Sequence, residues 1–280
     1  MTSSVATTTA TPTLSDLLAQ RRPLVMGVLN VTPDSFSDGG QFFSSEQAVA
    51  RARRMVADGA DLIDIGAEST RPYGDAVAVS VDEELRRLEP ILPAVRRMGV
   101  PVSIDSMKAD VAGWALDNGA SIANDVWGLQ RDSGMAPLVA RRNVPVIMMH
   151  NRERADPALD IMADIKTFFA RSLEIAERSG IRRESIVLDP GIGFGKTPEQ
   201  SMTAIARLAE LKDFQLPLLV GASRKRFIDR ISPAPPDQRI GGSITAHTIA
   251  VLNGAAIIRA HDVAETVQAL RVLTAIRARA

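Results

Sequence analysis

Basic side chains that could bind a phosphate or diphosphate follow several short apolar runs of this chain. Arginine suits such a group because its planar guanidinium makes bidentate hydrogen bonds to phosphate oxygens. The predicted phosphate-binding residues are Arg71, Lys225, Arg259 and His261. By contrast, Arg224 and Arg226 are expected to be solvated on the surface.

Acidic and amide side chains form a second set. Asp105, Asn124 and Asp189 each lie at or near the end of an apolar run. Their oxygens could accept hydrogen bonds from the donor-rich edge of a heterocycle. Each could instead cap the helix that follows, as Asp105 could do before SMKADV.

A third group of residues offers oxygen ligands for a metal ion. Asn30 ends the first apolar run, and the loop after it contains Asp34 and Asp38. Mg²⁺ is usually bound by a few protein oxygens together with substrate phosphates, so these residues could hold Mg²⁺ beside a diphosphate.

Several other chemistries are excluded by composition and spacing. The chain has no cysteine, which removes disulfides, thiolate nucleophiles and Cys-ligated metals. The segment GIGFGKT has three residues between Gly191 and Gly195, where a nucleotide-binding P-loop needs four before its Gly-Lys pair. The histidines have no zinc-binding spacing, and His247 is expected to be packed in a helix.

The elements that must position these groups alternate regularly. Eight β-branched, mostly apolar runs are predicted as fully covered parallel strands, with amphipathic helices between them. The strands are predicted at 24–31, 62–67, 101–105, 121–126, 144–149, 185–189, 217–222 and 256–260. The helices are predicted at 45–58, 82–98, 107–118, 134–142, 158–179, 198–211, 242–253 and 262–278.

Eight such units without a break in composition favour a single (β/α)8 TIM barrel over an open doubly wound sheet. We expect the barrel over residues 21–280 and a mobile N-terminal tail over residues 1–20. In a barrel the carboxyl ends of all strands converge on one face, which brings the polar groups together.

Charge and hydropathy narrow the partners and the location. Lys plus Arg and Asp plus Glu both total 33, so a nucleic-acid or membrane-surface partner is not expected. No apolar stretch is long enough for a transmembrane helix, and the N-terminus does not resemble a secretory signal. The default expectation is a soluble cytoplasmic protein.

Seven segments in order resemble the motifs of dihydropteroate synthases. They are NVTPDSFSDGG, ESTRP, VSIDSMK, the Asn-Asp of IANDV, LDPGIGFGK, GASRK and IIRAHDV. The resemblance spans essentially all of residues 24–276. It implies a barrel, usually a homodimer and a sulfonamide target. It also implies a transferase that joins 6-hydroxymethyl-7,8-dihydropterin diphosphate to p-aminobenzoate, releasing diphosphate and forming 7,8-dihydropteroate for folate synthesis.

The resemblance also implies a role for each matching residue. Asn30 would ligate Mg²⁺ on the diphosphate. Catalytic roles would fall to Asp105, Asp189, Lys225, Arg259 and His261. The pterin diphosphate would contact these five together with Thr70, Arg71, Asn124 and Met148. Phe36, Pro72, Phe194 and Ser223 would border p-aminobenzoate.

Two other enzyme classes remain as alternatives. A corrinoid methyltransferase that uses methyltetrahydrofolate would share the barrel and the pterin clamp, but it has no use for the Arg259–His261 pair. A Schiff-base aldolase could use Lys225 at a strand end. The sequence also departs from the family pattern at Tyr73, at Ser106 and after His150, where NRERADPA follows.

Overall fold

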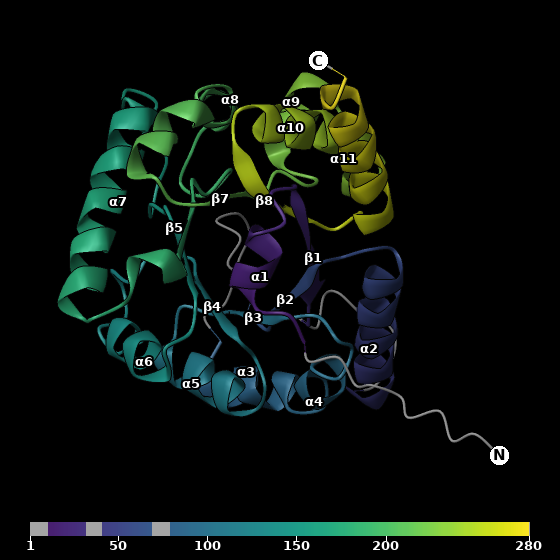
Figure 1. Cartoon of the computed structure of the whole chain (residues 1–280), viewed down its shortest axis with the longest axis vertical. Helices are drawn as coiled ribbons and strands as arrows, with labels where there is room; N and C mark the ends of the chain where they lie inside the picture. Colours follow the sequence, from purple (N-terminus) through teal and green to yellow (C-terminus); the bar gives the residue numbers. More distant parts are fainter. Residues whose placement is uncertain (1–10, 32–40, 69–78, 280) are drawn as a thin grey trace.

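The computed structural model describes residues 11–31, 41–68 and 79–279. Within them, eight parallel strands pair in chain order, and β8 closes the barrel on β1 (Figure 1). The strands are β1 (Leu24–Asn30), β2 (Leu62–Gly66), β3 (Val102–Asp105), β4 (Ile122–Asp125), β5 (Val146–Met149), β6 (Ile186–Asp189), β7 (Leu218–Val220) and β8 (Ala255–Ala260). The predicted (β/α)8 barrel is therefore confirmed.

Helices surround the barrel as predicted, with local differences. The α-helices are α1 (Leu14–Leu18), α2 (Gln41–Ala57), α3 (Val81–Leu88), α4 (Leu92–Val95), α5 (Ala109–Asp117), α6 (Met135–Arg142), α7 (Ile161–Arg178), α8 (Pro198–Ala206), α9 (Arg226–Ile231), α10 (Ile240–Leu252) and α11 (Val263–Arg277). Short 3₁₀ turns are η2 (Arg183–Ser185), η3 (Leu208–Phe214) and η4 (Pro236–Gln238). The helix predicted over 82–98 is divided into α3 and α4, because Pro90 between them has no backbone N–H to continue α3.

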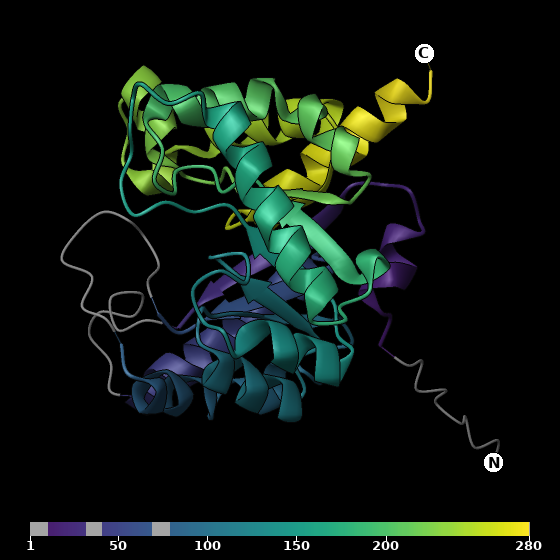
Figure 2. The same cartoon turned by 90° about the vertical axis from the view of Figure 1, so that its left-hand side faces the viewer.

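The amino-terminal segment corrects one expectation. Residues 1–20 were expected to be a mobile tail, but Leu14–Leu18 form helix α1, which Thr13 caps. Leu14 and Leu17 are buried against Leu24 and Leu62 at the starts of β1 and β2. Apolar burial therefore anchors this short helix, which lies over the centre of the ring in Figure 1 and at one end of the barrel in Figure 2.

Strand alternation separates two cores. One face of each strand meets the surrounding helices in a large outer cluster, to which Val25, Ile63 and Leu188 belong. The other face fills the lower barrel with an inner cluster that joins α1. The inner strand residues are Leu24, Met26, Leu62, Ile122, Ile147, Val187, Leu219 and Ile257. These apolar side chains form a floor, and the next inward-facing position on each strand lies above it.

Candidate active site

The inward positions above the apolar floor are mainly polar. Two residues after Leu62, Ile122, Val187 and Ile257 of the inner cluster come Asp64, Asn124, Asp189 and Arg259. Because side chains on a strand alternate between faces, these four share the inner face with the floor. The two-residue period thus explains how positions far apart in the sequence meet at the carboxyl ends of the strands.

Arg259 lies at the centre of this polar layer. Its Nε donates to Asp64 Oδ2 at 2.7 Å, and its Nη2 donates to Asp105 Oδ2 at 2.7 Å. Asn124 donates from Nδ2 to the same Asp64 oxygen at 3.2 Å. The two carboxylates raise the pKa of Arg259 against the effect of its burial, so the guanidinium stays charged.

This network qualifies the prediction that Arg259 is simply a phosphate ligand. Two of its nitrogens are committed to buried carboxylates, whereas Nη1 forms no hydrogen bond with the described residues. Asp64 is fully buried and had been given no role. Its position two residues after Leu62 was the signal that could have identified it.

Asp105 has an acceptor oxygen available to a ligand. The residue is buried, and its Oδ1 has no hydrogen-bond partner among the described residues. Burial raises the pKa of Asp105 to about 7, while the Arg259 charge acts in the opposite direction. A buried acceptor without a donor is costly, so this atom is suited to receive an N–H or O–H from a bound molecule.

Asp189, Lys225 and Phe194 lie on the side of the mouth formed by the ends of β6 and β7. Asp189 Oδ1 accepts the Gly191 backbone N–H at 2.7 Å, and burial raises the pKa of this carboxyl to about 6. Lys225 Nζ lies 4.2 Å from the centre of the Phe194 ring, a cation–π arrangement. Lys225 is half-buried, so its charge faces a partly desolvated space.

Ser223 and His261 are adjacent after β7 and β8. Ser223 Oγ accepts the His261 backbone N–H at 3.2 Å and lies 3.1 Å from His261 Nδ1. Arg224 is not a freely solvated surface residue as expected, because its Nε pairs with Asp262 Oδ2 at 3.0 Å. Arg226 is exposed, in agreement with the prediction.

Met148, predicted to contact the pterin, does not face the inside of the barrel. It is fully buried in the outer cluster, toward the helices. Ile147 belongs to the inner cluster, so Met149, two residues on, is the methionine on the inner face, where it packs with Phe194 and Val126. The prediction for Met148 was therefore off by one residue, which on a strand reverses the face.

The remaining predicted residues are placed as follows. Asn30 ends β1 and pairs in register with Gly66, half-buried on the face that carries Leu24 and Met26. The candidates Phe36, Thr70, Arg71 and Pro72, together with Asp34, Asp38 and Tyr73, lie outside the described residues. In the described part of the chain, no cluster of three His, Asp or Glu side chains could hold a metal ion.

Lys196 and His150 were not predicted as site residues. Lys196 is buried, and its Nζ donates to the carbonyl oxygens of Gly191 at 2.8 Å and Phe194 at 3.2 Å. It lies 2.6 Å from His150 Nδ1. A P-loop lysine would face outward to a phosphate, so this inward geometry agrees with the exclusion of a P-loop.

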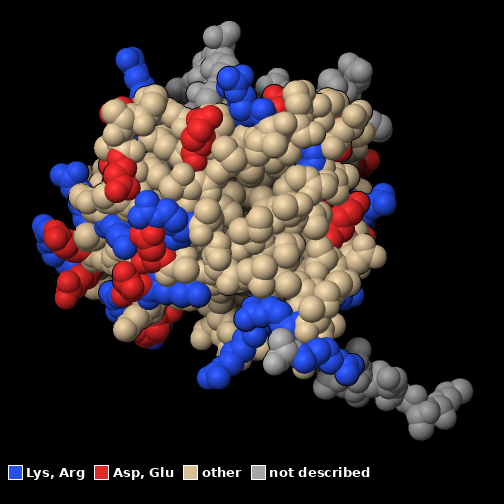
Figure 3. All heavy atoms as spheres, turned by 90° about the horizontal axis from the view of Figure 1, so that it is seen from above, with Lys and Arg blue, Asp and Glu red and all other residues tan. Residues whose placement is uncertain are grey.

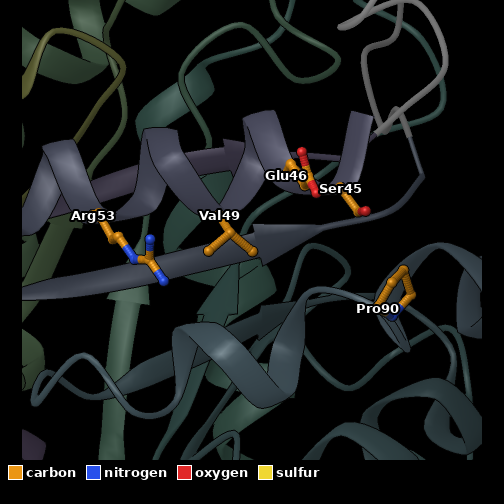
Figure 4. Close-up of a pocket in the computed structure, with 5 residues that line it drawn as sticks. All are labelled: Ser45, Glu46, Val49, Arg53 and Pro90. Atoms are coloured by element: carbon orange, nitrogen blue, oxygen red, sulfur yellow. The ribbon is translucent and has the colours of Figure 1, made fainter. Parts of the chain in front are cut away.

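A separate recess lies in the helical shell. It has a volume of about 390 Å³ and is lined by Ser45, Glu46, Val49 and Arg53 of α2 and by Pro90 between α3 and α4 (Figure 4). It is removed from the polar strand ends and contains one acidic and one basic side chain. We therefore place the candidate active site in the barrel mouth. Among the described helices, none is long and apolar enough to span a membrane.

Comparison with known proteins identifies the family of the chain. A family model described as pterin binding enzyme matches residues 26–261. The dihydropteroate synthase of Bacillus subtilis is 41% identical over 262 residues, covering 93% of this chain and 91% of that protein.

Solved structures are equally similar. The dihydropteroate synthase of Xanthomonas albilineans with 4-aminobenzoic acid is 43% identical with a TM-score of 0.88, covering 92% of this chain and 94% of that one. The Yersinia pestis enzyme in a sulfonamide drug complex is 43% identical with a TM-score of 0.86, covering 93% and 96%. The barrel is therefore that of a pterin-binding enzyme. Within this class, the chain belongs to the dihydropteroate synthase family.

Proposed function

We propose that this protein condenses 6-hydroxymethyl-7,8-dihydropterin diphosphate with p-aminobenzoate, forming 7,8-dihydropteroate and diphosphate for folate synthesis. The observation that supports it most directly is the buried Oδ1 of Asp105 beside Asn124 and Arg259, an acceptor for which the described residues supply no donor. A corrinoid methyltransferase would also need a pterin clamp. However, the basic residues beside this clamp favour a substrate with an anionic leaving group.

The pterin is held by its hydrogen-bond donors. Its amino-pyrimidinone edge presents N–H groups, which Asp105 and Asp189 can accept. Asn124 donates its Nδ2 to Asp64, which orients the carboxamide and leaves its Oδ1 as a further acceptor. Because Arg259 holds Asp64 and Asp105 in place, the acceptors are arranged before the substrate binds.

The leaving diphosphate is bound by Arg259 and His261. Arg259 Nη1 is available for a phosphate oxygen, and Ser223 fixes the position of His261. Since Asp64 and Asp105 offset much of the Arg259 charge, the half-buried Lys225 is needed as a further cation. Thr70 and Arg71 complete the proposed set.

The reaction then needs little covalent help from the protein. The bond between the methylene carbon and the diphosphate oxygen breaks, and the electron-rich pterin ring stabilises the positive charge left on that carbon. The amine of p-aminobenzoate forms the new C–N bond and loses a proton. Phe194 and Ser223, with Phe36 and Pro72, would border this second substrate. The protein accelerates the reaction by orienting the two substrates and by excluding water from the site.

Mg²⁺ is part of the proposal as an aid to the leaving group. Asn30 lies at the carboxyl end of β1 on the inner face, and an amide oxygen suits a hard cation whose other ligands are phosphate oxygens. When bound, Mg²⁺ would neutralise charge on the departing diphosphate.

A p-aminobenzoate-dependent assay tests the function. The purified protein is mixed with the dihydropterin diphosphate, p-aminobenzoate and Mg²⁺, and released diphosphate is measured. We expect release that requires the arylamine and is inhibited by sulfonamides. Absence of arylamine-dependent release would overturn the proposal, and omission of Mg²⁺ in a parallel reaction tests the metal.

The homodimer is proposed through the side of the barrel that carries α9, α10 and α11. These helices lie together at the top of Figure 1, and Figure 3 shows this side with few charged side chains at its centre. Among the described residues, the large exposed apolar side chains are Ile231, Ile249, Leu252, Val272 and Ile276, all from these three helices. Sedimentation of Leu252→Asp at the same concentration as wild type should yield monomers; an unchanged dimer would exclude this face. A cytoplasmic location completes the proposal, and fractionation of cells tests it.

A further inference from the structure

Lys196 stands at the centre of a buried polar chain beneath the active-site mouth. Its side chain is 1% exposed, although it ends in an ionisable amine. Three acceptors surround Nζ: the carbonyl oxygens of Gly191 and Phe194, and His150 Nδ1. An ammonium has three donors and no acceptor, so each of these groups can accept one of its protons.

The next members fix the protonation of His150. This ring is fully buried, and its Nε2 lies 3.0 Å from Asp164 Oδ2. Because Nδ1 accepts from Lys196, the imidazole proton resides on Nε2 and is donated to Asp164. Burial and the Lys196 charge lower the pKa of His150 to about 4, which keeps the ring neutral at pH 7. Arg152 also binds Asp164, at 2.9 Å, and ends the chain.

This network of buried side chains connects the loop after β6 to the segment after β5. Gly191 has a φ of +65°, and a Cβ there would lie 2.0 Å from the His150 carbonyl oxygen. Gly195 has a φ of +54°, and its Cβ would lie 2.4 Å from the Arg152 carbonyl oxygen. The loop backbone therefore lies directly against residues 150–152, with Lys196 holding it from within.

The fastened loop carries groups that face the mouth. The Phe194 ring packs with Val126 and Met149 and lies under the Lys225 ammonium. Asp189 accepts the Gly191 N–H, but this proposed pterin acceptor is itself the last residue of β6, so the strand fixes its position. Any shift of the Gly191 and Phe194 carbonyls would move the Phe194 ring and, with it, the contact with Lys225.

We propose that Lys196 is a positioning residue for the arylamine substrate: through its hydrogen bonds to the Gly191 and Phe194 carbonyls it sets the loop that places the Phe194 ring. This role rests on the proposed function, in which Phe194 borders p-aminobenzoate. His150 and Asp164 support the role by holding the lysine from the opposite side.

Charges around the lysine give the role a pH dependence. Burial lowers the pKa of Lys196 to about 7; the carboxylates of Asp189 and Asp164 oppose this change, and the Lys225 and Arg152 charges add to it. A neutral amine has one donor fewer than an ammonium. Below neutral pH, the protonated Lys196 can therefore make all of these hydrogen bonds. As the pH rises and the amine loses a proton, one of them is lost.

The kinetic test uses Lys196→Met, which keeps the length and removes the donors. We expect KM for p-aminobenzoate to rise at least tenfold, while KM for the dihydropterin diphosphate changes less than threefold. The wild-type KM for p-aminobenzoate should increase above pH 8, and the variant should show no such pH dependence. Asp164→Asn, which retains Lys196, should change KM in the same direction by a smaller factor. Lys166→Met, on the outer face of α7, is the matched control.

A second measurement does not depend on turnover. Trp127 packs on the cluster that contains Phe194, so in a Trp114→Phe background it reports on the loop. Acrylamide quenching of Trp127 should increase in Lys196→Met and not in Lys166→Met. Unchanged quenching together with an unchanged KM for p-aminobenzoate would overturn the inference, as would equal losses for both substrates. If the protein had no synthase activity but quenching still increased in Lys196→Met, the proposed function would be refuted. The inference that Lys196 positions the loop would remain.

Discussion

Replacing Arg259 by methionine should strongly destabilise the fold. The side chain is 17% exposed, and its partners Asp64 and Asp105 have side chains that are 0% and 8% exposed. Removal of the guanidinium leaves two buried carboxylates without their cation. Breaking one buried ion pair from one side costs about 3–5 kcal/mol, so we expect a loss of this size at pH 8.

The loss should depend on pH in a definite direction. The Arg259 charge lowers the pKa of Asp105, which burial raises to about 7, so the variant should have a still higher pKa at this carboxyl. Above pH 7 the variant then retains a proton that wild type has released. Its relative stability should fall by up to about 1.4 kcal/mol per pH unit and be least impaired near pH 6.

Urea unfolding followed by circular dichroism, at one protomer concentration and at pH 6 and pH 8, measures both effects. Asp64→Asn in the Arg259→Met background is the matched control, because it removes one of the unpaired charges and should restore part of the stability. A loss below about 1 kcal/mol at pH 8, with no improvement in the double variant, would refute this account of the polar layer.

Three further predictions concern single residues. Burial raises the pKa of Asp105 to about 7, so the folding stability of wild type should fall as the pH rises from 4 to 7. Asp105→Asn removes the ionisable carboxyl. Its unfolding free energy relative to wild type, measured by urea unfolding, should therefore increase over that pH range. Gly191→Ala should abolish activity and lower the melting temperature, because the new Cβ would meet the His150 backbone. Gly99→Ala is the control: Gly99 has a similar φ but open space around it, so the substitution should destabilise the fold by only about 1–3 kcal/mol. Equal effects of the two substitutions would contradict the loop packing. Leu17→Ala should destabilise by about 2–5 kcal/mol in the same unfolding assay, and an unaffected midpoint would mean that α1 does not anchor the barrel floor.

The sequence predicted the barrel because each strand is a short β-branched run, and the period of the pattern identified all eight. Single-residue orientation was harder. Met148 and Met149 are equally apolar, so only the inner position of Ile147 decides which of them faces the site. Similarly, α1 is one turn and a half long and gives too short a pattern to be distinguished from a polar tail.

The electrostatics of the site were outside the reach of the sequence. Arg259 and Asp64 are 195 residues apart, and only the closed barrel makes them neighbours. The sequence excludes a P-loop at GIGFGKT but does not indicate a role for Lys196, because that role depends on the direction in which the glycine-rich turn folds. The positive φ values at Gly191 and Gly195 direct that turn inward, and no spacing rule indicates this direction.

The apolar floor closed by α1 gives the barrel a dead end. In the described part of the chain the barrel is open at the carboxyl ends of its strands, so diphosphate and the pteridine product leave on the side where both substrates enter. A product that stays bound in the mouth therefore excludes the next pair of substrates.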